Sequence, residues 1–277
     1  MTYATVMVSL ALDQSNEARL EAAGQIAERF DAAIVGIAAA QFSPPLYYTT
    51  GEQAQNLIDQ GRASVEKRIA ELEVQFREAT KNRAKHVEWR SAIDFPARYI
   101  LQEARCADIV ISGGQNAAFL DPFALASPKD LVMQAGRPLL IVPDTVKGLD
   151  LRSILMAWKD TAEARRAIAD SLPVLRKAKN VSVVEIMEGG GSRSAALSRV
   201  RDVVAWLSRH GVSAAELVPE QNDGRGATIQ IDRIAADLGA GLVVAGAYGH
   251  SRFRELILGG MTQHLISQPD RCVLLSH

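Results

Sequence analysis

The sequence predicts an α/β protein built from two tandem Rossmann-like domains, each with a five-stranded parallel sheet. Short apolar runs rich in Val and Ile alternate with longer segments of helical periodicity along the whole chain. This alternation is typical of repeated β-α-β units with right-handed crossovers. The same succession of elements occurs twice, and a length of 277 residues suits two domains of ordinary size.

The first half contains apolar runs too short and too β-branched for most helices, so we expect buried strands there. We place these strands at Thr5–Leu10, Ala33–Ala39, His86–Ser91, Asp108–Ser112 and Leu139–Val142. Helical spacing or charged amphipathic patterns predict helices at Asn16–Phe30, Glu52–Thr80 and Pro96–Arg105. Gln41–Gly51, which contains two adjacent prolines and two adjacent tyrosines, is predicted to be a loop.

The second half follows the same rules. Its predicted strands are Ser153–Trp158, Val181–Met187, Val212–Val218, Leu242–Ala245 and Cys272–Leu275. Its predicted helices run from Asp160-Thr161 to Lys177 and over Ser192–Arg209, Thr228–Leu238 and Thr262–Gln268. Pro269 ends the last of these helices.

The two halves also align with each other, which indicates a duplication. The segment 13–19 aligns with 159–165, the segment 108–113 with 241–246, and Arg137–Val142 with Arg271–Ser276. We expect a polar linker at Pro143–Leu151 and therefore domains at residues 1–145 and 150–277.

A glycine-rich segment follows the fourth strand of the second half. Gly246 and Gly249 come directly after that strand, and Gly259 and Gly260 precede the last helix. Glycines let the backbone approach a bulky anion closely, and the unpaired N–H groups of a helix start suit a phosphate. Without further support, an ordinary tight turn before a helix explains this spacing equally well.

The spacing Gly246-x-x-Gly249-x9-Gly259 resembles the nucleotide loop of the universal stress protein family, in which a Ser or Thr follows the last glycine. Here Gly260 takes that place, and Thr262 supplies a hydroxyl two residues later. The resemblance covers the whole chain in tandem form. It implies the strand order 3-2-1-4-5 with helices on both faces in each domain, and a nucleotide between strands 1 and 4.

Family members commonly dimerise through their fifth strands, so the resemblance also implies that the two fifth strands pair within this chain as a pseudo-dimer. A homodimer of whole chains is the alternative. The resemblance implies ATP as the ligand, with or without Mg²⁺. The residues expected to hold it are Ala157, Trp158, Lys159, Met187, Gly246, Gly249, His250, Gly259, Gly260, Met261 and Thr262.

The two predicted sites differ. The first half keeps Gly113 but has Asn116 and Ala126 where the second half has glycines, and Pro128 removes a backbone donor. The first half retains the family's acid as Asp13, whereas the second half has Lys159 there. Only the second domain is therefore expected to bind ATP. Residues 112–115 are similar to the pyrophosphate loop of ATP pyrophosphatases. That loop belongs after the first strand, whereas these residues follow the fourth, and residues 116–117 lack its Asp-Ser.

Composition narrows the function. A net charge of −1 with dispersed Lys and Arg argues against nucleic-acid binding, and no apolar run approaches the length of a membrane span. The start lacks the basic region of a signal peptide, so we expect a cytoplasmic protein with two reduced cysteines. The five histidines have no metal-ligand spacing.

No catalytic motif is recognisable, so turnover is not expected. The prediction is an adenine-nucleotide-binding stress-response protein that senses or regulates together with an unidentified protein partner. A weak Mg²⁺-dependent ATP hydrolase and an interaction scaffold without ligand turnover are the alternatives.

Overall fold

The fold is known from a computed structural model of the chain. The structure describes residues 2–12, 14–42, 51–114, 121–187, 191–220, 226–247, 260–268 and 270–277.

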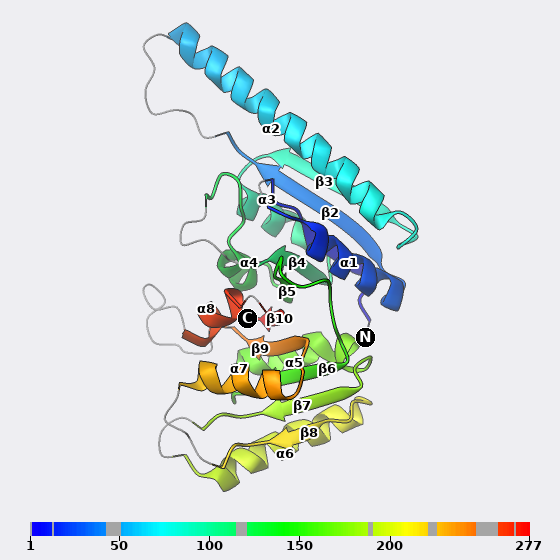
Figure 1. The fold of residues 1–277 in the computed structure, drawn as a ribbon, viewed down its shortest axis with the longest axis vertical. Coiled ribbons are helices and arrows are strands. Elements are labelled where there is room, and N and C mark those ends of the chain that lie inside the picture. The colour runs from blue at the N-terminus through cyan, green and yellow to red at the C-terminus, as the bar shows by residue number, and fades with distance from the viewer. Residues whose placement is uncertain are drawn as a thin grey trace.

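Among the described residues, the first half holds five strands and four α-helices, in the order expected from the sequence (Figure 1). They are β1 (Thr5–Ser9), α1 (Glu17–Phe30), β2 (Ala33–Ala40), α2 (Gly51–Thr80), β3 (Val87–Ile93), α3 (Pro96–Glu103), β4 (Ile109–Gly113), α4 (Pro128–Gln134) and β5 (Leu139–Val142). Helix α3 continues into a short 3-10 turn, η1 (Ala104–Cys106).

The second half repeats the arrangement. Its described elements are β6 (Ser153–Ala157), α5 (Ala162–Leu175), β7 (Asn180–Val184), α6 (Arg193–Arg209), β8 (Ala215–Leu217), α7 (Ala227–Asp237), β9 (Leu242–Gly246), α8 (Gly260–Ile266) and β10 (Cys272–Ser276).

The ten strands form one sheet in the order β3-β2-β1-β4-β5-β10-β9-β6-β7-β8. Within each half this is the predicted order 3-2-1-4-5, and all pairings there are parallel. The fifth strands β5 and β10 pair antiparallel, with Leu274 opposite Leu140, so the predicted pseudo-dimer contact is present. The two sheets are therefore continuous across the junction.

Helices cover both faces of this sheet, as predicted. Helices α1, α2, α5 and α6 pack against one face, where Val6, Val8 and Ile109 belong to the core. Helices α3, α4, α7 and α8 pack against the other face, where Met7 and Val110 lie. Adjacent strand residues thus point to opposite cores, as the two-residue period of a strand requires.

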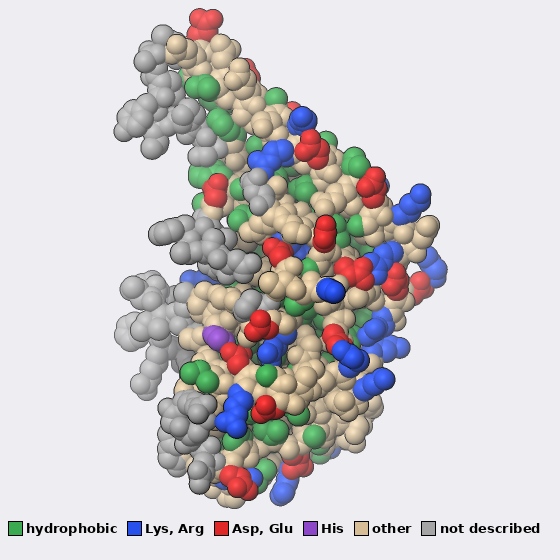
Figure 2. All heavy atoms as spheres, viewed as in Figure 1, with side chains coloured by type: hydrophobic (Ala, Val, Ile, Leu, Met, Phe, Trp, Pro, Cys, Tyr) green, Lys and Arg blue, Asp and Glu red, His purple; other side chains and the backbone are tan. Residues whose placement is uncertain are grey.

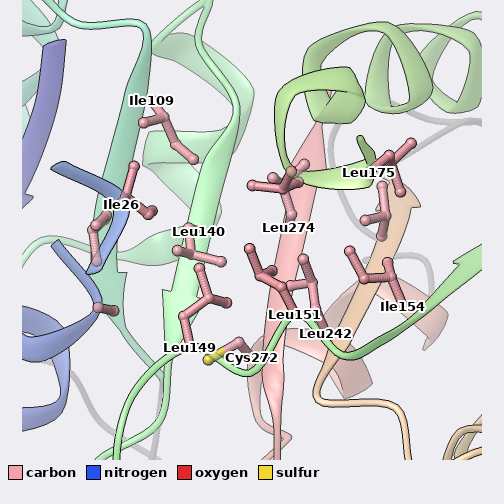
Figure 3. Packing of buried hydrophobic residues seen from close by; sticks show 14 of the residues in the cluster. Ile26, Ile109, Leu140, Leu149, Leu151, Ile154, Leu175, Leu242, Cys272 and Leu274 are labelled. Atoms are coloured by element: carbon pink, nitrogen blue, oxygen red, sulfur yellow. The ribbon is translucent and has the colours of Figure 1, made fainter. Parts of the chain in front are cut away.

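The segment predicted as a polar linker, Pro143–Leu151, also contributes to the core. Leu149 and Leu151 are buried and pack in the core that spans the junction (Figure 3). Leu149 N–H also donates to Gln25 Oε1 of α1 at 2.7 Å. The linker therefore fills the gap between the two halves, and burial of its leucines outweighs the polarity of the residues around them.

Two other elements differ from the expectation. Helix α4 was not predicted, because its seven residues are too few to show a helical periodicity. It begins at a proline, which suits the first position of a helix. Strand β8 covers only three residues of the predicted Val212–Val218 strand, at the edge of the sheet. A short edge strand offers few unpaired backbone groups to another chain.

Positively and negatively charged side chains are interspersed over the face shown in Figure 2. No helix in the described part of the chain combines the length and the apolarity needed to cross a membrane.

Candidate functional site

The candidate site lies at the carboxyl ends of β6 and β9, which are neighbours in the sheet. The chain leaves β6 towards α5 on one face, while α8, which follows β9, packs on the other face. Such a reversal of direction is the switch point at which open α/β sheets bind ligands.

Trp158 extends β6 by one residue, since its backbone N–H donates to Val184 O of β7 at 2.8 Å. Its side chain is 9% exposed and turns into the core beneath α5. The indole Nε1 is buried and has no hydrogen-bond partner among the described residues. A buried N–H without an acceptor is costly, so this donor is an unsatisfied group beneath α5.

Lys159 follows as an exposed residue at the start of the turn into α5. Its carbonyl accepts a hydrogen bond from Thr161 N at 2.7 Å, and Thr161 Oγ1 caps the helix by accepting from Ala164 N at 3.3 Å. The expected aspartate-to-lysine exchange therefore places a cation at the rim of the switch point.

Gly246 ends β9 directly against the first turn of α5. A Cβ atom there would lie 2.4 Å from Ala164 N and 2.6 Å from Glu163 C. The close approach of helix α5 therefore requires this glycine, whether or not a phosphate also does.

Trp158, Ala157 and Gly246 line one cavity with residues of α5, of about 160 Å³. Ligand pockets are usually about 300–1,000 Å³. The 160 Å³ counts all the space between the atoms and the open mouth, and no water-sized group fits inside, so this space is a narrow packing gap between the strand ends and α5.

Helix α8 begins at Gly260, two residues before the predicted start, so Gly260, Met261 and Thr262 form its first turn as the phosphate hypothesis needs. Met261 packs against the core on the α7 side of the sheet, and Thr262 is buried. The role of Thr262 as a phosphate ligand stays a prediction.

Met187 follows β7 and is half-buried against the same core as Trp158. The predicted residues Gly249, His250 and Gly259 lie outside the described residues, as does Asp13 of the first half. The structure thus brings Ala157, Trp158 and Gly246 together and leaves the phosphate side of the hypothesis as a prediction.

One acidic residue near this edge is not among the predicted site residues. Glu185 directly follows β7, is buried, and its carboxylate accepts hydrogen bonds from Arg199 Nε at 3.1 and 3.2 Å. These bonds raise the pKa of the Arg199 guanidinium. Acids at the end of the second strand bind ribose hydroxyls in dinucleotide folds. We had extended the strand to Met187, which hid the strand-end position of Glu185.

Three of the described histidines have local side-chain partners. His264 Nε2 lies 2.5 Å from Asp232 Oδ2, and His277 Nδ1 lies 3.0 Å from Ala247 O. His210 packs on Trp206 with ring centroids 4.1 Å apart. In the described ranges, no three His, Cys, Asp or Glu side chains are grouped so that they could hold a metal ion.

No protein-family model matches the sequence, and no curated protein matches it. Solved structures do match. A universal stress protein from Archaeoglobus fulgidus DSM 4304 superposes with a TM-score of 0.72 at 14% identity, covering 98% of this chain and 97% of its own. A protein of unknown function from Pseudomonas aeruginosa PAO1 superposes with a TM-score of 0.60 at 18% identity, covering 99% and 92%.

The first of these structures covers both halves in a single chain, so the likeness is to the whole ten-stranded arrangement. With the strand order of each half and the antiparallel β5–β10 junction, the chain has the universal stress protein fold in its tandem, two-domain form.

Proposed function

We propose that the second half, residues 150–277, binds an adenine nucleotide, and that the protein acts as a non-catalytic sensor or regulator. The observation that carries the proposal is the glycine spacing that begins at Gly246, at the end of β9 in the β6–β9 switch point of this fold. Trp158, which lies beside Gly246, has a buried indole Nε1–H without a partner among the described residues, and purine rings carry nitrogen acceptors along their edges.

The remaining groups at this edge suit the rest of the ligand. Glu185 supplies a carboxylate on the β7 side, where a ribose would lie, in place of the aspartate that Lys159 replaces. Lys159 is a compact positive charge at the rim, which suits a phosphate chain. The glycine spacing from Gly246 to Gly259 supports the same assignment by its resemblance to the family's nucleotide loop.

ATP titration into the full chain tests the proposal. A ligand at a hundred times its dissociation constant should stabilise the fold by about 2.7 kcal/mol, which a thermal shift detects. Trp158→Phe keeps a ring in the cavity and removes the N–H. Loss of one hydrogen bond, about 1 kcal/mol, should weaken ATP, AMP and adenosine equally, by about fivefold.

Trp206→Phe is the matched control, because Trp206 packs on α6 beside His210 and should leave all three affinities unchanged. Lys159→Asp should weaken ATP more than adenosine, and added salt should reduce that difference. The proposal is wrong if no adenine nucleotide binds, or if Trp158→Phe binds all three ligands as tightly as the unmodified protein.

A further inference from the structure

The N-terminal part of helix α2 projects beyond the sheet (Figure 1). None of residues 51–64 is buried. The buried residues of this helix all follow that segment, and they are Val65, Ile69, Leu72, Phe76 and Thr80. A helical segment of this length measures about 21 Å, so residues 51–64, called the arm below, can contact another molecule along several turns.

The arm carries an apolar stripe that continues the buried face of α2. Ala54, Ile58 and Gly61 precede Val65 at spacings of four, three and four residues, which is the spacing of a coiled-coil seam. Ile58 is 40% exposed, and Leu57 beside it is 41% exposed. Hydrophobic side chains follow this part of the helix in Figure 2. In the described part of the chain, the stripe is thus incompletely covered near its N-terminal end.

The base of the arm is different, because an aromatic ring lies on the stripe there. A Cβ atom at Gly61 would be 2.2 Å from Phe42 Cδ2. Phe42 is itself only half-buried, and it packs against the small cluster that contains Val65 and Ile69. The arm therefore has aliphatic side chains to cover near its tip and a partly exposed ring at its base.

Charge divides along the same segment. Residues 51–59 include two acidic residues and no Lys or Arg, so their net charge is −2. Residues 60–68 include three basic residues and one acidic residue, so their net charge is +2. Two such helices side by side attract each other when they are antiparallel and repel each other when they are parallel. The charge pattern is therefore complementary to a second copy of itself.

We propose that the arm is a dimerisation element, in which the arms of two chains pack antiparallel about a two-fold axis. Ile58 of each chain then lies opposite Gly61 of the partner subunit and covers its Phe42 ring. The fifth strands offer no free edge for this purpose, since β5 and β10 already pair within the chain. A two-fold contact of this kind is closed, because each arm uses the same surface.

The size of the contact sets its strength. Each chain contributes one face of a single helix and one ring, so the interface belongs to the small class that buries less than about 1,200 Å² in total. Such contacts are weak, and the dimer should depend on protein concentration. We expect monomers at about 1 µM and mostly dimers at about 500 µM.

Sedimentation velocity of the full chain over this concentration range tests the proposal. Ile58→Glu places a charge in the apolar contact and should raise the dissociation constant at least about tenfold. Val74→Glu is the matched control: Val74 is 58% exposed on another side of α2, outside the arm, and its replacement should leave the dimer unchanged. Both changes are at exposed positions, so thermal unfolding at low concentration should be the same for both variants and the unmodified protein.

A chain that stays monomeric at about 500 µM overturns the proposal, and so does a dimer that Ile58→Glu leaves intact. Residues 43–50, which lie outside the described residues, and a different protein are the alternative occupants of the stripe. Either occupant would leave the purified chain monomeric.

Cross-linking tests the antiparallel register. With residue 58 opposite residue 61, the two copies of residue 58 are about 4.5 Å apart along the helix axis, and the two copies of residue 54 are about 17 Å apart. In a Cys106→Ser background, where Cys272 is buried, Ile58→Cys should be cross-linked by a short bifunctional maleimide and Ala54→Cys should not. Equal cross-linking of the two variants would indicate parallel arms and overturn the proposal.

Discussion

Replacing Leu274 by alanine tests whether the two halves of the chain unfold as one unit. Leu274 of β10 lies opposite Leu140 of β5, and both are essentially unexposed at the centre of the ten-stranded sheet. A buried Leu→Ala change costs about 2–5 kcal/mol, least where the surroundings can collapse into the space. Strands on both sides hold this site open, so we expect about 3–4 kcal/mol.

Urea unfolding of two variants, each with one reporter tryptophan and the other two of the three tryptophans replaced by Phe, measures the effect. Trp89 reports the first half, where it packs on Phe76 with ring centroids 5.4 Å apart, and Trp206 reports the second. With a slope of about 3 kcal/mol per molar urea, Leu274→Ala should lower the midpoint by about 1 M for both probes. Leu57→Ala, at an exposed position on α2, should change it little.

The reasoning depends on a core that continues through β5, β10 and the buried linker residues. If the Trp206 transition moves while the Trp89 transition stays, the halves are separately stable domains and the junction is a docking contact. Two resolved transitions in the unmodified protein would lead to the same conclusion. A double mutant of Leu140 and Leu274 should cost less than the sum of the single changes, because both remove the same contact.

Two further predictions concern stability. Burial raises the pKa of Asp170 in the folded state above its value in the unfolded state. At a pH above both values the charged carboxylate therefore lowers the stability of the fold. Asp170→Asn should raise the melting temperature at pH 7, and this gain should fade as the pH falls to about 4 and below. Gly246→Ala should destabilise by about 1–3 kcal/mol in urea, because its Cβ meets backbone of α5. Gly260→Ala, where a Cβ meets nothing within 4 Å, should be neutral or up to about 1 kcal/mol stabilising; equal losses for the two glycines would contradict the packing argument.

Local patterns predicted most of the fold. Local preference and overall fold agree in most elements. Val181–Val184 is rich in β-branched residues and forms a strand of the sheet, and α5 begins at an N-cap threonine, Thr161. The burial of two linker leucines could not be predicted in this way. Leu149 and Leu151 are apolar residues among polar neighbours, and only the β5–β10 pairing creates the space they fill.

The part of the candidate site that lies at strand ends could be predicted from the sequence. Ala157, Trp158 and Gly246 converge because parallel strands bring their carboxyl ends to one edge. The missing acceptor at Trp158 Nε1 was not predictable, since it depends on every group around the indole. Glu185 could have been found by ending the predicted strand Val181–Met187 three residues sooner, at Val184.

Arg19 and Arg165 show that equivalent positions in the two halves can have different surroundings. They hold the same place in aligned segments, yet one is buried and the other is exposed. In the second half, backbone of α5 lies directly on Gly246, which leaves no space for an arginine and closes most of the cavity. In the first half a guanidinium lies on Gly113 instead, and the cavity beside it stays open. A duplicated sequence thus produces two switch points that differ in what lies on the strand-end glycine: a guanidinium at Gly113 and helix backbone at Gly246.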